Sequence, residues 1–399
     1  MIQYMRYAFI GLCLILIGYF SFRTYLYYFD TTVPEVSMVG LDEGKTYAGD
    51  ISVKLKGASP YKVAYASVWL DDQELEYVKL NRQSFEHALT MPSLDNGPHT
   101  LRAEVIDGTK SANKTIFERK FYADNLDLQA ALVSTSLDHK VQQGRCLHVK
   151  FQVNKPTVQA TLQALSANHT CFPKSKHSLV YEAFVPVECE QVANEYPFTI
   201  EIKDGVGNKV LLEDKFQVTP VNFVKKILHV QNNKLKSELE FTSLQERDLE
   251  EALDRITRSS VKEKLWNGAF DVPILMTRVS TDFGVIRTSQ ERGRSVHKAL
   301  DLVAEPKSVV WASQAGIVVL KDRFTHSGNT VVLDHGNGII SLYFHLHDFA
   351  DIEVGQKLKK GNPLGRMGMT GFANGQHLHW EIRVNNVAVD PMQWTQLIG

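Results

Sequence analysis

The chain has 399 residues, of which 44% are hydrophobic and 22% are charged, values that exclude a fibrous or wholly disordered protein. Its formal net charge of -1 provides no whole-protein field that would attract nucleic acid, so we expect no nucleic-acid partner. The length predicts two or three domains.

The first 30 residues predict a transmembrane helix. An uncharged, mostly apolar run from residue 7 to residue 22 lies between Arg6 and Arg23. As a helix it would span about 24 Å, slightly less than the ~30 Å hydrocarbon core of a bilayer, and the aromatic residues after Arg23 suit the membrane interface. Because no small-residue cleavage site follows, we expect an uncleaved signal anchor, with the chain after residue 30 exported.

Three cysteines, Cys146, Cys171 and Cys189, lie in the part that we expect to be exported. An oxidising compartment permits disulfides, and Cys171–Cys189 is the pair that we expect. Three cysteines leave one over, so the sequence does not decide the pairing.

Residues 31–125 and 126–220 predict two tandem β-sandwiches of immunoglobulin-like type. Short alternating runs lie at residues 51–55, 66–70 and 100–106, the second followed by a turn at Asp71-Asp72 and the third by a turn at Asp107-Gly108, the pattern of antiparallel strands. A weak repeat relates residues 99–124 to residues 198–219, since both contain a strand, an Asp-Gly turn and a second strand. We expect these two β-sandwiches to be folded spacers. A binding role is the alternative.

Residues 221–264 predict a connector that contains one helix, at about 243–257. Ser243 and Glu246 form a capping box. Apolar residues then recur at helical spacing. We expect the charged residues around that apolar stripe to form a solvated face: Glu246, Arg247, Asp248, Glu250, Glu251, Asp254 and Arg255.

Residues 265–399 differ in composition and predict a Gly-rich antiparallel β domain. Seven of the 14 histidines fall between His297 and His379, and 13 of the 25 glycines fall between Gly284 and Gly399. Strand-like runs lie at 309–311, 316–320, 330–333 and 339–343, with turns at 327–329 and 337–338.

Three histidine clusters in this domain suggest a metal site. They are His297-x-x-x-Asp301, His345-x-His347 and His377-x-His379. On a strand, His377 and His379 would point to one side, roughly 6.5–7 Å apart. Two imidazoles and a carboxylate leave a fourth tetrahedral position open, as at a catalytic zinc. The remaining histidines can act as a base or stabilise a transition state.

The ordered motifs of the last 120–130 residues resemble the lysostaphin/LytM-type zinc endopeptidases. The resemblance rests on Phe283-Gly284-x-x-Arg287, His297-x-x-x-Asp301, Tyr343-x-His345-Leu346, Gly368-x-Thr370-Gly371 and His377-Leu378-His379-x-Glu381. It implies a zinc-dependent endopeptidase that hydrolyses peptide cross-links of bacterial peptidoglycan, with one Zn²⁺ per peptidase domain.

The same resemblance implies the roles of five residues. His297, Asp301 and His379 would be the zinc ligands. His345 and His377 would be the catalytic pair that activates water and stabilises the oxyanion, with the division of labour between them open. It gives no such role to His326, His335 and His347, which we expect to be structural or solvent-facing.

Two other functions compete with the enzyme. A non-enzymatic LytM-like regulator would bind and activate cell-wall amidases, but all five site positions are retained here. A biotinyl or lipoyl carrier domain would need a modifiable lysine in a hairpin and has no use for the histidines.

The expected location is the bacterial cell envelope, with a single-pass inner-membrane anchor, the catalytic domain in the periplasm and the peptide stems of peptidoglycan as substrate. The sequence does not decide between a D-Ala–diaminopimelate bond, favoured by an inner-membrane anchor, and a glycine bridge. Cell-wall hydrolase or division partners, the oligomeric state and autoinhibition also stay open.

Overall fold

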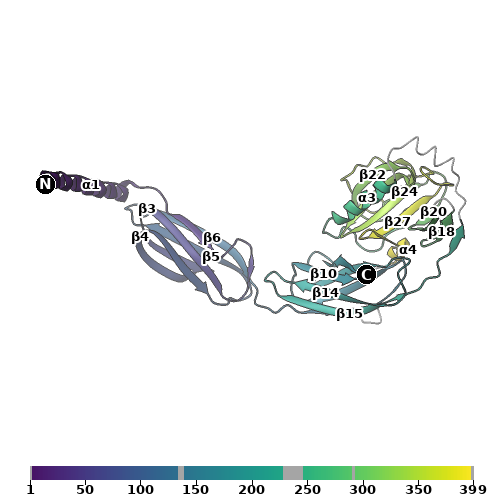
Figure 1. Ribbon diagram of the computed structural model, residues 1–399, viewed down its shortest axis with the longest axis horizontal. Helices are drawn as coiled ribbons and strands as arrows, with labels where there is room; N and C mark the ends of the chain where they lie inside the picture. Colours follow the sequence, from purple (N-terminus) through teal and green to yellow (C-terminus); the bar gives the residue numbers. More distant parts are fainter. Residues whose placement is uncertain (1, 134–138, 228–245, 290–292, 397–399) are drawn as a thin grey trace. The chain divides into compact units, whose positions relative to one another are not determined.

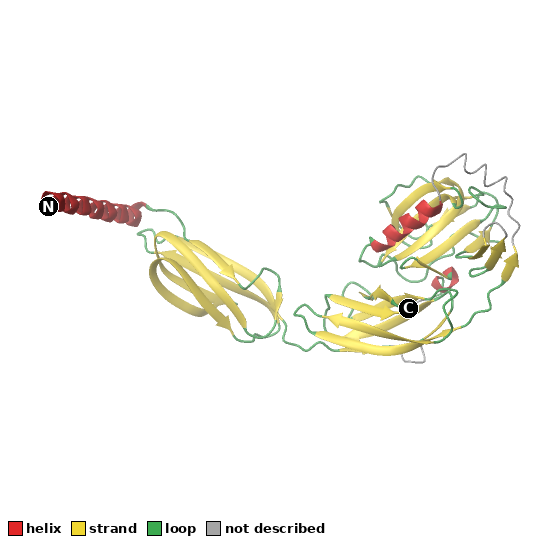
Figure 2. Cartoon of the chain, viewed as in Figure 1, coloured by secondary structure: helices red, strands yellow, loops and turns green. Residues whose placement is uncertain are grey.

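The structure is a computed structural model that describes residues 2–133, 139–227, 246–289 and 293–396 (Figure 1). The chain forms two compact units, one of residues 1–127 with 205–208 and the other of residues 128–204 with 209–399. The described part is mostly β, as the sequence predicts, and Figure 2 shows the few helices among its strands.

The first unit begins with a long apolar helix. Helix α1 (Ile2–Phe29) continues through both flanking arginines. Among the described helices, the segment Gln3–Phe29 is the one long and apolar enough to cross a membrane. At its C-terminal end the guanidinium of Arg23 lies over the ring of Tyr61, 4.2 Å from the centroid. The anchor itself stays a prediction.

The rest of the first unit is one hydrogen-bonded sheet of the order β1-β3-β5-β6-β2, with β4 paired to β3. The expected turn at Asp71 and Asp72 is present, and both residues have positive φ, 48° and 67°, which suits a tight hairpin. The immunoglobulin-like type stays a prediction. The strands are β1 (Glu35–Val39), β2 (Thr46–Tyr47), β3 (Ile51–Leu70), β4 (Gln73–Met91), β5 (Gly97–Asp107) and β6 (Lys114–Ala123).

The second unit opens with two sheets, β11-β10-β14-β15-β8 and β12-β13-β9-β7. Buried side chains such as Phe151, Phe198 and Phe216 fill a shared core. The strands are β7 (Ala130–Leu132), β8 (Lys140–Gln142), β9 (Cys146–Val153), β10 (Gln159–Ala164), β11 (Ala167–Thr170), β12 (Phe172–Pro173), β13 (Val180–Pro186), β14 (Glu195–Lys203) and β15 (Lys209–Thr219).

The expected disulfide between Cys171 and Cys189 is wrong, because all four cysteines are free. Cys171 lies in the core shared by these two sheets. Cys189 instead packs against the core of the C-terminal domain. Burial raises the pKa of each of these two thiols to about 12, so both are protonated and unreactive at neutral pH.

The C-terminal domain is built on a sheet in which ten of the described strands are joined, with the central order β17-β20-β27-β24-β23-β22-β25. The elements are β16 (Lys225–Ile227), α3 (Glu246–Arg258), β17 (Arg278–Thr281), β18 (Ile286–Ser289), β19 (Gly293–Val296), β20 (Leu300–Val303), β21 (Val309–Trp311), β22 (Gly316–Phe324), β23 (Gly328–Gly336), β24 (Ile339–Phe349), β25 (Lys357–Leu358), β26 (Pro363–Met367), β27 (Leu378–Val384), β28 (Val387–Val389) and α4 (Pro391–Trp394).

Helix α3 forms where the sequence predicts a helix, although Ser243 and the rest of 228–245 lie outside the described residues. Leu249 and Leu253 are buried in a cluster with sheet residues that include Phe324, Leu342 and Phe344. The helix therefore packs on one face of the ten-stranded sheet (Figure 2). The expectation of a solvated charged face is incomplete for Glu246 and Glu250, which are partly exposed but also accept hydrogen bonds from Ser327 and Arg383.

The two parts of the second unit share a packed junction. The backbone of Cys146 exchanges two hydrogen bonds with the side-chain amide of Gln393, at 2.8 and 2.7 Å. The amide of Asp390 donates to the carbonyl of Gly144 over 2.7 Å. Buried aromatic rings, Phe184 and Trp394 among them, pack across the junction. A few side chains of the β region, such as Phe172 and Phe184, thus pack into the hydrophobic core of the C-terminal domain, while the β region also has a core of its own.

Candidate active site

Three neighbouring strands position the side chains of the candidate site. Asp301 on β20 pairs with His379 on β27, which pairs with Phe344 on β24. Alternation along β27 sends Leu378 and Trp380 into the core, where both are fully buried. His379 therefore points to the opposite face, toward Asp301.

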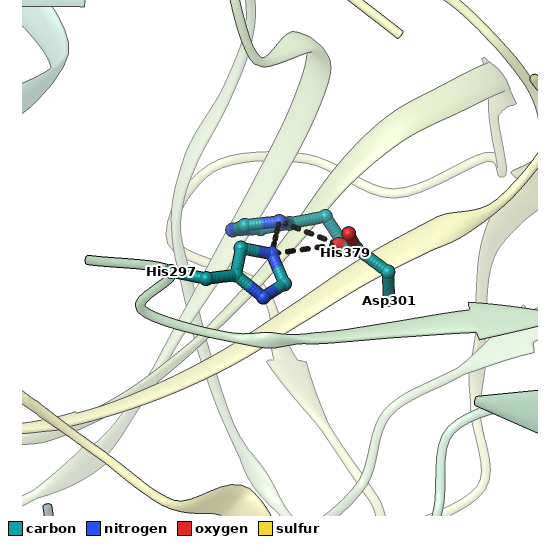
Figure 3. A group of neighbouring side chains, drawn as sticks. All are labelled: His297, Asp301 and His379. Carbon is teal, nitrogen blue, oxygen red and sulfur yellow. Dashed lines mark hydrogen bonds and ion pairs between the residues drawn. The ribbon is translucent and has the colours of Figure 1, made fainter. Parts of the chain in front are cut away.

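The three predicted ligands lie together at this face (Figure 3). The Nε2 atom of His297 lies 2.9 Å from Oδ1 of Asp301 and 3.3 Å from Nδ1 of His379, which is itself 3.0 Å from the same carboxylate oxygen. Tetrahedral zinc with bonds of ~2.0–2.1 Å would hold its ligand atoms about 3.3 Å apart. The donor set and its spacing therefore fit a single zinc-sized ion, and the ligand roles stay a prediction.

Each of these three side chains also has a polar partner outside the cluster. His297 donates its Nδ1–H to the carbonyl of Asp282 over 2.9 Å. Nε2 of His379 lies 3.9 Å from a carboxylate oxygen of Glu381. Arg287 donates to the second oxygen of Asp301 over 3.1 Å. Such partners fix the tautomer and direction of metal-binding imidazoles and carboxylates.

The electrostatics of the cluster follow from burial and close pairing. Burial opposes ionisation of Asp301, but the two histidines outweigh it and hold the pKa of this carboxyl well below its usual range. Burial lowers the pKa of His297. Burial also opposes protonation of His379, but the hydrogen bond to Asp301 and the nearby carboxylate of Glu381 outweigh it and raise its pKa to about 9. A proton and a metal ion therefore compete for Nδ1 of His379.

The predicted catalytic pair lies beside this cluster. His345 donates its Nδ1–H to the carbonyl of Thr370 over 2.9 Å, and His377 donates its Nδ1–H to the carbonyl of Gly375 over 2.8 Å. The two rings have centroids 4.7 Å apart, and Nε2 of His377 lies 3.7 Å from Oδ1 of Asp301. Each ring therefore keeps Nε2 as its lone-pair nitrogen.

The backbone and the burial of His345 are both unusual. Its φ of 61° is left-handed, a conformation that non-glycine residues rarely adopt and that concentrates at functional sites. Burial, with the neighbouring His377, moves the pKa of His345 well below its ordinary value. Burial likewise lowers the pKa of His377. Both rings are therefore neutral at pH 7 and can accept a proton.

A cavity of about 540 Å³ opens over the site. Its walls include the five predicted site residues and, from neighbouring elements, Arg278, Phe372 and Glu246. His326 also lines it, so this histidine faces the cleft. His347 is exposed, whereas His335 is buried with both ring nitrogens hydrogen-bonded. The cavity is large enough to admit a peptide segment.

Sequence reasoning gave no role at the site to several residues around it, although Glu381 appears in a quoted motif. Glu381 and Arg383 share the face of β27 that carries His379, and alternation along the strand could have identified them. Glu246 and Glu250 lie at a four-residue spacing on α3. Their partners, such as Ser327 for Glu246 and Arg383 for Glu250, could not have been identified, because they lie far from the helix in the chain.

Comparisons with known proteins identify the domain. Residues 295–391 match Peptidase family M23. DD-carboxypeptidase/endopeptidase Mpg of Neisseria meningitidis serogroup B (strain ATCC BAA-335 / MC58) is 34% identical over 126 residues, 31% of this chain and 29% of that protein. Peptidoglycan DD-endopeptidase ShyC of Vibrio cholerae serotype O1 is 32% identical over 120 residues, 30% of this chain and 28% of that protein.

The chain matches less than a third of the length of these curated relatives. A crystal structure of a putative peptidase M23 from Pseudomonas aeruginosa is 24% identical, with a TM-score of 0.47, and covers 63% of this chain and 94% of that one. The predicted resemblance to lysostaphin/LytM-type peptidases is confirmed at the level of the family. The C-terminal part of the chain is a domain of peptidase family M23.

Proposed function

We propose that this chain is a zinc-dependent endopeptidase that hydrolyses the peptide cross-links of bacterial peptidoglycan. One observation carries the proposal: Nε2 of His297, Oδ1 of Asp301 and Nδ1 of His379 converge within 3.3 Å of one another, beside the two lone-pair nitrogens of His345 and His377. The names of the relatives, a peptidoglycan DD-endopeptidase among them, support the substrate class.

The chemistry divides between the metal and the histidine pair. Zinc held by His297, Asp301 and His379 would supply Lewis-acid chemistry, polarising the scissile carbonyl and lowering the pKa of a water molecule. A neutral imidazole, His345 or His377, accepts the proton of the attacking water at Nε2. Once protonated, it can donate that proton to the leaving amine. The second imidazole faces the same space and can stabilise the developing oxyanion when it carries a proton.

The bond that we propose is the D-Ala–diaminopimelate cross-link. The relatives named DD-endopeptidases favour it over a glycine bridge. We also propose that α1 is an uncleaved, single-pass inner-membrane anchor, with the catalytic domain in the periplasm. The length and apolar composition of Gln3–Phe29 support this location. Fractionation of cells should recover the protein in the membrane with its first 30 residues intact; a soluble protein that begins after residue 22 would contradict the anchor.

The decisive experiment uses the full chain purified in detergent micelles. We expect about one zinc per chain by elemental mass spectrometry, and release of un-cross-linked muropeptides from purified cell-wall sacculi. His297→Ala should lose both. His347→Ala is the matched control, because it removes an exposed imidazole of the same domain. The proposal fails if the wild-type protein binds no zinc or if His297→Ala digests sacculi as well as wild type.

The same experiment separates the enzyme from the regulator. An intact chain that releases no muropeptides by itself, yet accelerates a purified cell-wall amidase, would identify a non-enzymatic regulator. Mass spectra of the released peptides would distinguish a D-Ala–diaminopimelate cleavage from a glycine-bridge cleavage.

A further inference from the structure

Helix α3 places a carboxylate in the wall of the candidate site. Glu250 lines the cleft, and its side chain is 45% exposed. Its two oxygens accept hydrogen bonds from Nη1 and Nη2 of Arg383, at 2.7 and 3.1 Å. This is a bidentate carboxylate–guanidinium pair, the geometry in which such a pair is strongest.

Arg383 links that pair to the metal cluster. Its guanidinium is buried, with the side chain only 3% exposed, and its Nε donates to Oε1 of Glu381 over 2.7 Å. The other oxygen of Glu381, Oε2, faces Nε2 of His379 at 3.9 Å. Glu250, Arg383, Glu381 and His379 therefore form an unbroken chain of contacts from the helix to a predicted metal ligand.

The charges of Glu250, Arg383 and Glu381 explain how Glu250 can affect His379 without contacting it. A buried guanidinium needs compensating acceptors, and here two carboxylates share it. Without the Glu250 carboxylate, the whole charge of Arg383 would act on Glu381. The Glu381 carboxylate would then be drawn toward Arg383, and its 3.9 Å contact with Nε2 of His379 would weaken, which removes one of the contacts that orient this ring.

Two further contacts tie α3 to the same site. Glu250 lies 3.4 Å from Nζ of Lys298, the neighbour of His297 in the chain. On the apolar face of the helix, Leu249 packs in a cluster with Phe344. The ring of Phe344 stacks on His379, with centroids 4.9 Å apart and planes 3° from parallel. The helix is thus connected to both histidine ligands.

We infer that Glu250 is a positioning residue of the metal centre: from helix α3 it holds Arg383 so that Glu381 orients His379 for metal binding. Docking of α3 is then a condition for a well-formed site, and this helix, which the sequence places in a connector, belongs to the C-terminal domain. The inference rests on the proposed zinc site.

The test compares metal affinity and ring geometry in the full chain in detergent micelles. Glu250→Gln should weaken zinc binding about tenfold, at the low end of the range for outer partners of metal ligands, as measured by competition with a chromophoric chelator. Glu251→Gln makes the same charge change on the same helix, where the carboxylate is exposed and pairs only weakly with Arg247, 3.7 Å away. It should bind zinc as wild type does.

A second measurement separates positioning from general destabilisation. The ¹⁵N chemical shifts of the His379 ring should change in Glu250→Gln, while circular dichroism and the midpoint of thermal unfolding report whether the domain remains folded. The effects of Glu250→Gln and Glu381→Gln on zinc affinity should be non-additive in the double variant, because both act through one contact chain.

The outcomes are distinguishable. If wild type binds no zinc, the proposed function fails and takes the inference with it. If wild type binds zinc but Glu250→Gln binds it equally well, or if the two single effects add, the inference is wrong and the zinc site stands. An unfolded Glu250→Gln would leave the coupling to be decided by Glu381→Gln and by the ring shifts in Glu250→Asp, which keeps the charge and should largely restore wild-type behaviour.

Discussion

Two buried histidines on adjacent strands of one sheet have opposite surroundings. His335, on β23, donates Nδ1–H to the carbonyl of Ala315 and accepts at Nε2 from the hydroxyl of Ser341, each over 2.7 Å. His345, on β24, has Nδ1 bound to the carbonyl of Thr370, and its side chain lines the cleft. One ring has both nitrogens occupied, and the other keeps a nitrogen for chemistry.

The difference shows that burial alone does not mark a catalytic histidine. Burial lowers the pKa of both rings, to about 4 for His335 and well below the ordinary value for His345. The hydrogen-bond partners of the two ring nitrogens distinguish His335 from His345. A nitrogen that is already hydrogen-bonded inside the core cannot take a proton from a substrate. His335 is therefore structural, and His345 is available as a base.

The largest expected difference between the two histidines is in activity. His345→Asn keeps a residue that tolerates the left-handed backbone at this position but removes the base. We expect hydrolysis of sacculi to fall roughly 10²–10⁴-fold, the usual contribution of a general base, with zinc content unchanged. His335→Gln should retain most activity. A loss of activity in a folded His335→Gln protein as large as that in His345→Asn would break the comparison.

The next largest effect is on the pH dependence of stability. His335 has a folded pKa of about 4 and an unfolded value near 6.5. The contribution of neutral, buried His335 to the free energy of unfolding is therefore fully present above pH 6.5. It is lost as the pH falls from 6.5 to 4, by up to about 3 kcal/mol. Urea unfolding at several pH values should show a shallower loss for His335→Gln than for wild type. Parallel curves would show that His335 does not titrate as the structure implies.

The third prediction concerns Arg287, on β18 beside the predicted ligands, which should affect metal affinity. Arg287→Gln removes the donor that holds Oδ2 of Asp301 at 3.1 Å. We expect zinc affinity to fall about 10–100-fold, with little change in stability because Arg287 lies at the cleft. Chelator competition measures the affinity, and Arg278→Gln, which changes another arginine of the cleft wall, is the control. Equal losses in both variants would contradict a specific role for Arg287.

The smallest expected effect is on stability, at the buried hydroxyl groups near His335. The hydroxyl of Tyr343 accepts from the backbone amide of Ser313 over 2.9 Å and lies within 2.9 Å of the hydroxyl of Ser341. Tyr343→Phe leaves that amide buried and unsatisfied, at a cost of about 1–2 kcal/mol in the free energy of unfolding. Urea midpoints would measure the cost, and zinc affinity should not change. A weaker zinc site without a change in stability would contradict a purely structural role for Tyr343.

Much of the fold follows from local pattern. Alternation identified strands such as β5, and the paired aspartates Asp71 and Asp72 marked a hairpin, because both signals depend only on neighbours in the chain. The convergence of His297, Asp301 and His379 could also be expected, since the order of motifs in the family indicated which segments meet. Their ligand roles and the catalytic roles of His345 and His377 stay predictions.

Other features depend on contacts that local pattern does not contain. Helical periodicity grouped Glu250 with solvent-facing charges. The periodicity shows which residues share a face of the helix, but it does not show which other parts of the protein contact that face. The partner of Glu250, Arg383, is 133 residues away in the chain. The expected pairing of Cys171 with Cys189 failed for a related reason: the two thiols belong to different cores, and cysteine spacing carries no such information.

The junction between the second β region and the C-terminal domain has a consequence for how this part of the protein unfolds. Trp394 is 1% exposed and packs against Phe184, and Gln393 exchanges two hydrogen bonds with the backbone of Cys146. Separating the two parts would expose these rings to water and break buried hydrogen bonds, so neither part gains by melting alone. Residues 128–396 should therefore give one calorimetric transition, and cleavage between the two parts should lower the heat resistance of both.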